Sequence, residues 1–231
     1  GPQKTIQPVG KIPVLINAII NANPDVATAA FAAIAATVII FIIVAYTQSI
    51  KVEVPLSFGR IRGYGIRWPL AFFYTSVIPV ILVSALLANI QLGAALLERT
   101  GRINAAAIAP WITGPGGQGG LVGTIIKQNS FAIGLTPYLQ AMVYVLIMVG
   151  GSIIFALFWM KTTGMDAKSQ AEQLAASGLQ IPGLRRDPRV IETLLARYIL
   201  PLTVMGGAAV GLLAAVSDLG GALVRGTGIL L

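Results

Sequence analysis

Four long apolar runs alternate with polar segments along this chain. None of them contains Asp, Glu, Lys or Arg, and they cover residues 26–46, 68–97, 138–160 and 198–217. A helix needs about 20 apolar residues to cross the hydrocarbon core of a bilayer, so each run is long enough for one crossing. The pattern predicts an all-α polytopic membrane protein whose spans form a transmembrane helix bundle.

The run over 68–97 is the longest and carries Pro79 in its first half. A proline inside a helix removes a backbone hydrogen bond and bends the helix, so we expect a kinked transmembrane helix over 68–97. Its residues Ile78, Ile81, Leu82 and Leu86 form one apolar face.

Two basic segments separate the spans. In 47–67, apolar residues alternate with polar ones from Val52 to Phe58, which predicts a strand in a hairpin-like loop with Arg60 and Arg62 near its tip. In 161–197, Asp166 is a candidate cap for a helix ending near Ala176, and Asp187-Pro188 begins another. A basic turn with Arg185 and Arg186 lies between these two helices.

The other polar segments are a lead-in over 1–25, a connection over 98–137, and a turn with the truncated start of a further transmembrane helix over 218–231. A short interfacial helix is possible over 12–20. The glycine run near residues 114–123 lacks the Lys-Ser/Thr ending of a phosphate-binding loop, so a surface loop is favoured.

The basic residues predict the orientation. Ten of the 16 lie in 47–67 and 161–197, and six lie in the other polar segments. Cytoplasmic loops carry the excess of Lys and Arg, so we expect 47–67 and 161–197 in the cytosol and 1–25 and 98–137 outside it.

Small residues form stripes in two of the spans. The first span has Ala29, Ala32, Ala33 and Ala36, and the fourth has glycines over 206–211. Such residues let helices approach closely, so both faces are predicted to be buried against other helices.

Composition supports the membrane assignment, because only 10% of residues are charged and 56% are hydrophobic. With no Cys or His, disulfides and the usual zinc, haem and Ser-His-Asp sites are excluded. No catalytic residue, cofactor or metal is expected, and the protein is predicted not to be an enzyme. Because the chain starts without Met and stops inside an apolar run, we expect a fragment.

The residue pattern leaves three classes of function open. They are a channel or translocon, one repeat of a secondary transporter, and a membrane scaffold that docks a cytosolic partner. The charge-free spans disfavour proton coupling, because ionisable groups within the membrane usually mark proton or ion pathways.

Longer motifs favour the first class. FYTSVIPVILVSALLANIQL (73–92) and the preceding VEVPLSFGRIRGYGIRWPL (52–70) resemble the SecY/Sec alpha-subunit family in its archaeal form. FWMKTTGMDAKSQAEQL (158–174), RYILPLTVMGGAAVGLLA (197–214) and GALVRGTGILL (221–231) resemble later parts of the same family, in the same order. The chain is similar to the C-terminal half, from the sixth helix to the start of the tenth.

The resemblance implies a protein-conducting channel that translocates secretory proteins and inserts membrane proteins, in a multi-pass protein of the cell membrane. Ile81 and Leu231 would belong to its apolar pore ring, and Val77, Ile78 and Pro79 to its lateral gate. Many family members carry Asn where this chain has Val77. The docking residues would be Arg60, Arg62, Arg185 and Arg186.

Partners are also implied by the resemblance. They are the SecE/gamma-type and beta-type small membrane subunits, the ribosome or a cytosolic translocation motor, signal sequences with nascent polypeptides, and the lipid bilayer.

Overall fold

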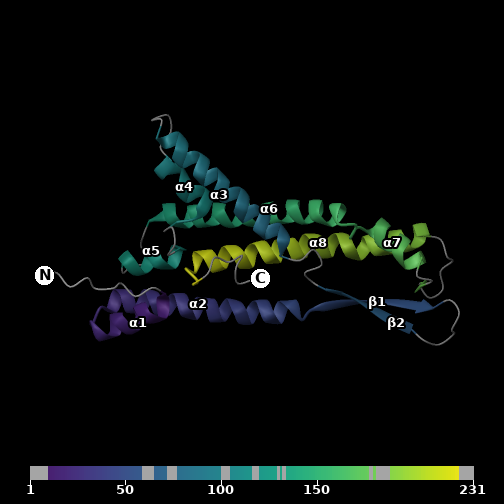
Figure 1. Cartoon of the computed structure of the whole chain (residues 1–231), viewed down its shortest axis with the longest axis horizontal. Coiled ribbons are helices and arrows are strands. Elements are labelled where there is room, and N and C mark those ends of the chain that lie inside the picture. The colour runs from purple at the N-terminus through teal and green to yellow at the C-terminus, as the bar shows by residue number, and fades with distance from the viewer. Residues whose placement is uncertain are drawn as a thin grey trace. The chain divides into compact units, whose positions relative to one another are not determined.

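The structure is a computed structural model that describes residues 10–58, 65–71, 77–99, 105–115, 120–128, 131, 134–176, 179–180 and 188–223. Most of these residues are helical (Figure 1). The elements in chain order are α1 (Lys11–Ile20), α2 (Pro24–Gln48), β1 (Lys51–Phe58), β2 (Gly65–Ala71), α3 (Ile78–Glu98), α4 (Ala105–Thr113), α5 (Gly120–Gln128), α6 (Leu135–Thr162), α7 (Ala167–Ala176), β3 (Leu179–Gln180) and α8 (Pro188–Leu219).

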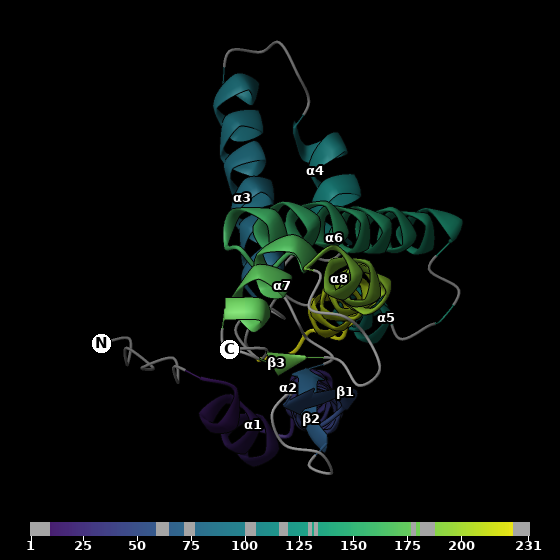
Figure 2. The ribbon, with the colours of Figure 1, turned by 90° about the vertical axis from the view of Figure 1, so that its right-hand side faces the viewer.

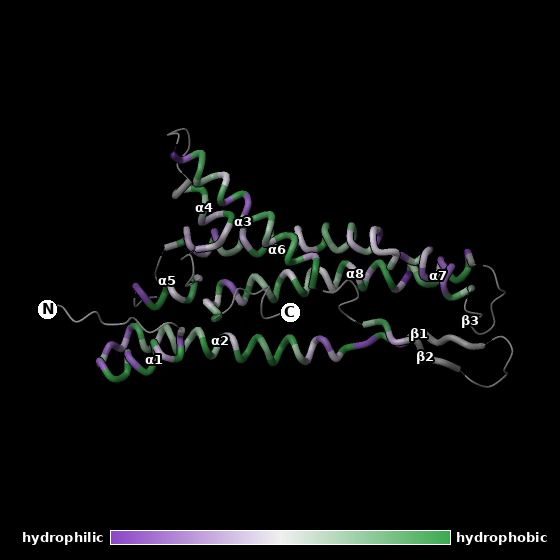
Figure 3. Tube along the Cα trace, in the orientation of Figure 1, coloured by the Kyte–Doolittle hydropathy of each residue, from purple (hydrophilic) through white to green (hydrophobic). Residues whose placement is uncertain are grey.

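Four helices, α2, α3, α6 and α8, are long and apolar enough to cross a membrane. Figure 3 shows that α2 is hydrophobic along most of its length and that the chain becomes hydrophilic where it enters β1. The predicted fold class is confirmed, and the chain is a multi-pass membrane protein.

The chain divides into two compact units, each described here by itself. The first unit contains residues 1–42, 86–147 and 213–231, and the second contains residues 43–85 and 148–212.

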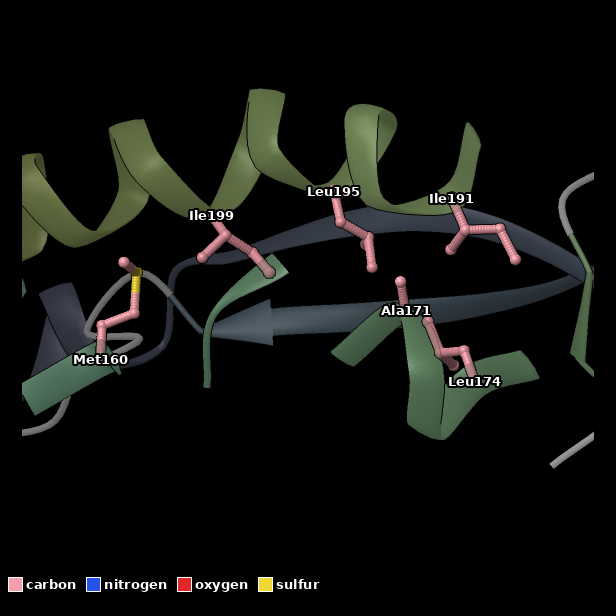
Figure 4. Packing of buried hydrophobic residues seen from close by; sticks show 6 residues of the cluster. All are labelled: Met160, Ala171, Leu174, Ile191, Leu195 and Ile199. Atoms are coloured by element: carbon pink, nitrogen blue, oxygen red, sulfur yellow. The ribbon is translucent and has the colours of Figure 1, made fainter. Parts of the chain in front are cut away.

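In the second unit, a hydrophobic cluster joins α7 to the first half of α8. Figure 4 shows the side chains of the two helices pointing toward one another. Leu195 is fully buried in it. The chain enters α7 through Asp166, whose carboxylate accepts hydrogen bonds from the hydroxyl and amide of Ser169 at 2.6 and 3.4 Å. This is the predicted helix cap. The cluster consists of Met160, Ala171, Leu174, Ile191, Leu195 and Ile199.

The predicted hairpin is present in the same unit. Strands β1 and β2 are antiparallel, with Lys51 opposite Ala71 and Ser57 opposite Gly65. The short strand β3, labelled in Figure 2, pairs with the end of β1, so the sheet order is β2-β1-β3. The two polar segments 47–67 and 161–197 are therefore joined by backbone pairing.

The glycines of α8 pack closely on α6, as predicted for the 206–211 stripe. A Cβ at Gly207 would lie 3.0 Å from the Cβ of Ala156, and one at Gly211 would lie 2.8 Å from the carbonyl oxygen of Met148. In the first unit, Ala33 of α2 is buried and the Cβ of Ala36 lies 3.5 Å from the Cβ position of Gly220. The glycine face of α8 is in close contact with α6, as expected, whereas in the α2 stripe Ala33 is buried and Ala29, Ala32 and Ala36 are only partly buried.

Two expectations about helix boundaries were wrong. The helix expected over 68–97 begins at Ile78, and residues 68–71 belong to strand β2. Pro79 is consequently the second residue of α3, where its missing N–H would have no helical acceptor, so it starts the helix instead of kinking it. The second difference is that 98–137, expected as a loop, contains α4 and α5.

Candidate gate and docking sites

The candidate gate residues lie at the start of α3. The carbonyl oxygen of Val77 accepts hydrogen bonds from the amides of Val80 and Ile81, at 3.2 and 3.4 Å. Val77 thus occupies the helix N-cap position, where Asn, Asp or Ser would supply a side-chain acceptor and valine supplies none. An asparagine at this position would therefore supply the helix cap that valine lacks.

The first turns of α3 have one tightly packed side. Val80 and Val83 are 0% and 2% exposed, and the Cγ2 atom of Val83 lies 3.0 Å from the Cβ position of Gly151 in α6. Ile81 is only partly buried. Because successive helical residues are about 100° apart, Ile78 and Ile81 share a side that points away from Val83. The structure thus brings Ile78 and Ile81 together and leaves Ile81 outside the α3–α6 contact.

Several predicted site residues lie outside the described residues. They are Leu231 of the expected pore ring and the four expected docking arginines, Arg60, Arg62, Arg185 and Arg186.

The sheet nevertheless brings together the strands that lead into the arginine segments. β1 ends at Phe58, two residues before Arg60, and β3 ends at Gln180, five residues before Arg185. Ser57 is paired with Gln180 and Phe58 with Leu179, in antiparallel register. β3 therefore lies beside the last residues of β1, and the two strands run in opposite directions. Sequence analysis did not predict β3. The nearest signal in the sequence was Pro182, which favours extended backbone only at Ile181, the residue that follows β3.

A second polar feature lies between α7 and α8 and was also not predicted. Two basic and two acidic side chains line a hollow of about 380 Å³ with Ala171. The signal in the sequence was the spacing of the charged residues, which are four positions apart on α7 and three apart on α8. Residues with such spacing share a face of a helix. The charged lining residues are Lys168, Glu172, Arg189 and Glu192.

Comparison with known proteins gives consistent matches. A family model described as SecY matches residues 5–231. The protein translocase subunit SecY of Methanococcus vannielii is 43% identical over 202 residues, which are 86% of this chain and 44% of that protein. The subunit of the same name from Methanocaldococcus jannaschii is 38% identical over 224 residues, or 97% of this chain and 50% of that protein.

Solved structures match as well. One described as "The structure of a protein conducting channel" has a TM-score of 0.75 and 36% identity, and the match covers 97% of this chain and 51% of that one. A second, described as showing that the plug domain of SecY stabilises the closed channel and maintains a membrane seal, gives the same values. The chain spans about half the length of the relatives that it matches.

Proposed function

The chain belongs to the SecY family, and we propose that it forms part of a protein-conducting channel, from the sixth to the start of the tenth helix of that channel. The observation that carries the proposal is the structural match over 97% of this chain to a protein-conducting channel at 36% identity. Its relatives are named as protein translocase subunits. The proposed location is the cell membrane, and the proposed role requires no catalysis by this chain.

We propose that Ile81 and Leu231 contribute to an apolar ring that seals the channel. Support comes from Ile81, which is apolar, partly buried and outside the contact between Val83 and Gly151. A narrow hydrophobic constriction excludes water and ions because water loses hydrogen bonds there. A passing polypeptide meets no polar group that would hold it.

We propose that the N-terminal end of α3 belongs to the lateral gate, with Val77, Ile78 and Pro79 as gate residues. Two observations support α3 and α6 as one flank of that gate: Pro79 lies in the first turn of α3, and Val83 packs on Gly151 of α6 in the second unit. Signal sequences would pass along this flank when they move from the channel into the lipid bilayer.

The alternative functions make different demands on the spans. A secondary-transporter repeat needs a polar substrate site near the membrane centre, often at interrupted helices. The four predicted spans contain no charged residue, and the described part of α3 is a continuous helix. A membrane scaffold needs no pore, and ion conductance of the reconstituted complex separates it from a channel.

Docking of a cytosolic partner is proposed for Arg60, Arg62, Arg185 and Arg186. The pairing of β1 with β3 supports this, because it places Gln180, five residues before Arg185, opposite Ser57, three residues before Arg60. Several arginines on one face suit the phosphates of ribosomal RNA, or an acidic surface of a translocation motor. Small subunits of the SecE/gamma and beta types are proposed as further partners within the membrane.

The channel proposal is tested with the full-length complex in planar bilayers and proteoliposomes. Ile81→Asn should keep the constriction wet and raise the resting ion conductance, whereas Ile81→Leu, which preserves volume and polarity, should leave it low. Translocation of a secretory protein into the same vesicles is the primary readout. Absence of translocation by the wild type would refute the channel function, and equal resting leak in all three proteins would remove Ile81 from the ring.

The docking proposal is tested by ribosome binding to the same vesicles over a salt titration. The double variant Arg60→Glu with Arg62→Glu should bind more weakly and show a shallower salt dependence. Lys51→Glu is the matched control, because Lys51 lies exposed at the other end of β1. An equal loss of ribosome binding in both variants would mean that binding depends on net charge alone. If neither variant loses binding, the arginines act only in setting the membrane topology.

A further inference from the structure

Helix α1 exposes one apolar face. Its four isoleucines are 55–76% exposed, whereas Ala18 of the same helix is 4% exposed. Because successive helical residues are about 100° apart, the four isoleucines fall on one side of α1 and Ala18 falls on the other. We call these four residues the isoleucine face. They are Ile12, Ile16, Ile19 and Ile20.

The polar residues of α1 and its C-cap lie away from the isoleucine face. By the same helical spacing, Lys11, Asn17 and Asn21 are more than about 90° from the centre of that face, so α1 is amphipathic. Its ten residues span about 15 Å, half of the hydrocarbon core of a bilayer. An amphipathic helix that is too short to cross can lie in the membrane interface, with its apolar face at the boundary between headgroups and acyl chains.

A tight turn fixes α1 next to the start of α2. The amide of Asn23 donates a hydrogen bond to the carbonyl oxygen of Ala18 at 2.9 Å, and Ala22 has a left-handed φ of 50°. This pattern ends a helix and redirects the chain. The two helices meet within the first unit, and Figures 1 and 2 both show α1 beside the start of α2.

The exposed surface of α2 is the first observation that favours lipid as the partner of the isoleucine face. α2 is long and apolar enough to cross a membrane. Its exposed apolar residues begin in its first turn with Val26 and continue with Phe31, which are 47% and 65% exposed. Only the turn over 21–23 separates α1 from this surface. The isoleucine face thus continues the surface that α2 presents to the acyl chains.

The kind of side chain is the second observation. Contacts between membrane helices are enriched in small residues, and the contact of α8 with α6 uses Gly207 and Gly211. The isoleucine face has no small residue. It carries the same kind of side chain as the exposed part of the α2 span, where Ile39 and Ile42 are 57% and 60% exposed. A surface of this composition suits acyl chains better than a second helix.

We propose that the isoleucine face docks on the lipid bilayer, just below the headgroups, and that α1 anchors the start of α2 at the membrane boundary. The turn over 21–23 transmits this anchoring, because its hydrogen bonds hold the end of α1 next to the first residue of α2. The inference requires only that α2 crosses the membrane, and it does not depend on the proposed channel function.

The test uses the full-length complex in liposomes, cysteine-free except for one spin label. This chain has no native cysteine. A label at Ile16 should collide more with oxygen than with a water-soluble nickel chelate, and should lie about 5–10 Å below the level of the headgroups. Asn17 is the matched control, because it is the next residue, is exposed and lies off the isoleucine face. A label there should show the opposite preference, and a label at Ile42 gives the reference value for lipid.

Two results at Ile16 would overturn the inference. Nickel access equal to that at Asn17 would place the isoleucine face in water, and low access to both reagents would mean that protein covers it. The double variant Ile12→Asn with Ile19→Asn should move the Ile16 label toward the aqueous phase, and an unchanged depth would show that the isoleucines do not hold α1 at the membrane. If this variant does not assemble, the single labels at Ile16 and Asn17 decide. Loss of translocation would refute the channel function and leave these readouts unaffected, since they require only insertion.

Discussion

The close contact between α8 and α6 at Gly211 should make this glycine intolerant of even one methyl group. In Gly211→Ala, the new Cβ would lie 2.8 Å from the Met148 carbonyl oxygen and 2.8 Å from Oγ of Ser152. Both atoms belong to α6, and the carbonyl oxygen is part of its backbone, so it cannot move by a change of rotamer. The two helices would have to separate by several tenths of an ångström or more.

Two opposing terms set the magnitude. Replacing glycine by alanine inside a helix gains about 0.5–1 kcal/mol, because the unfolded chain has less conformational freedom to lose. Overpacking in a close contact costs about 1–3 kcal/mol. The net change for Gly211→Ala is a loss of about 1 kcal/mol.

Gly150→Ala in α6 isolates the steric term. A Cβ at Gly150 meets nothing within 4 Å, so this variant keeps the helix-propensity gain without the clash. The two variants should differ by the overpacking cost alone, about 2 kcal/mol. For a chain of this size that corresponds to about 4–8 °C in Tm.

The measurement is thermal unfolding of both variants and the wild type in the same detergent, with assembly checked by size-exclusion chromatography. The expected order of Tm is Gly150→Ala, wild type, then Gly211→Ala. If Gly211→Ala melts at or above Gly150→Ala, the helices are not in close contact at this glycine and the packing argument fails.

Three further outcomes are expected. Val77→Asn should raise the free energy of unfolding by about 1 kcal/mol, because it supplies a new N-cap to α3. Val77→Ala should not raise it, and an equal gain from both variants would exclude capping as the cause. Asp166→Ala should speed hydrogen exchange of the first amides of α7 by a factor that corresponds to about 1 kcal/mol, and Ser169→Ala should speed it less. Unchanged exchange in both variants would mean that the 2.6 Å hydrogen bond from the Ser169 hydroxyl to Asp166 does not stabilise the helix. Leu195→Ala should lower the free energy of unfolding, obtained from thermal unfolding, by about 2–5 kcal/mol, because Leu195 is fully buried between α7 and α8. Leu200→Ala, at a residue of the same helix that is 53% exposed, should lower it by under about 0.5 kcal/mol. Similar losses in the two variants would contradict the α7–α8 core.

The sequence predicts elements well where one local signal dominates. The charge-free run from Val26 to Tyr46 lies within α2, the alternation from Val52 to Phe58 lies within β1, and Asp166 caps α7. Each depends on burial periodicity or on a cap, which neighbouring residues alone determine.

Prediction from the sequence fails where contacts with residues far away in the chain determine the secondary structure of a segment. Trp68-Pro69-Leu70-Ala71 is apolar enough for a membrane helix, but it pairs with β1, with Ala71 opposite Lys51. Helices α4 and α5 were missed because Pro110 in α4 and the glycines of α5 signal loops. Gly120 is explained only by its approach to Asp218. Of the candidate site, the position of Ile81 outside the Val83 contact follows from helical spacing, whereas the β1–β3 pairing depends on residues more than 100 positions apart.

The hairpin also limits what can add to it through the backbone. In the described part of the chain β2 is one of the two edge strands of the sheet, the other being the two-residue β3, and β2 contains Pro69 opposite Glu53. A proline has no N–H, and strands tolerate it where the missing donor would face the free edge. An additional strand would therefore find an interrupted ladder at residue 69, which disfavours both self-association of exposed hairpins and capture of stray extended peptides. At this edge, the proposed docking of a cytosolic partner would consequently depend on side chains, and arginine-to-glutamate exchanges would change it without altering the strand pairing.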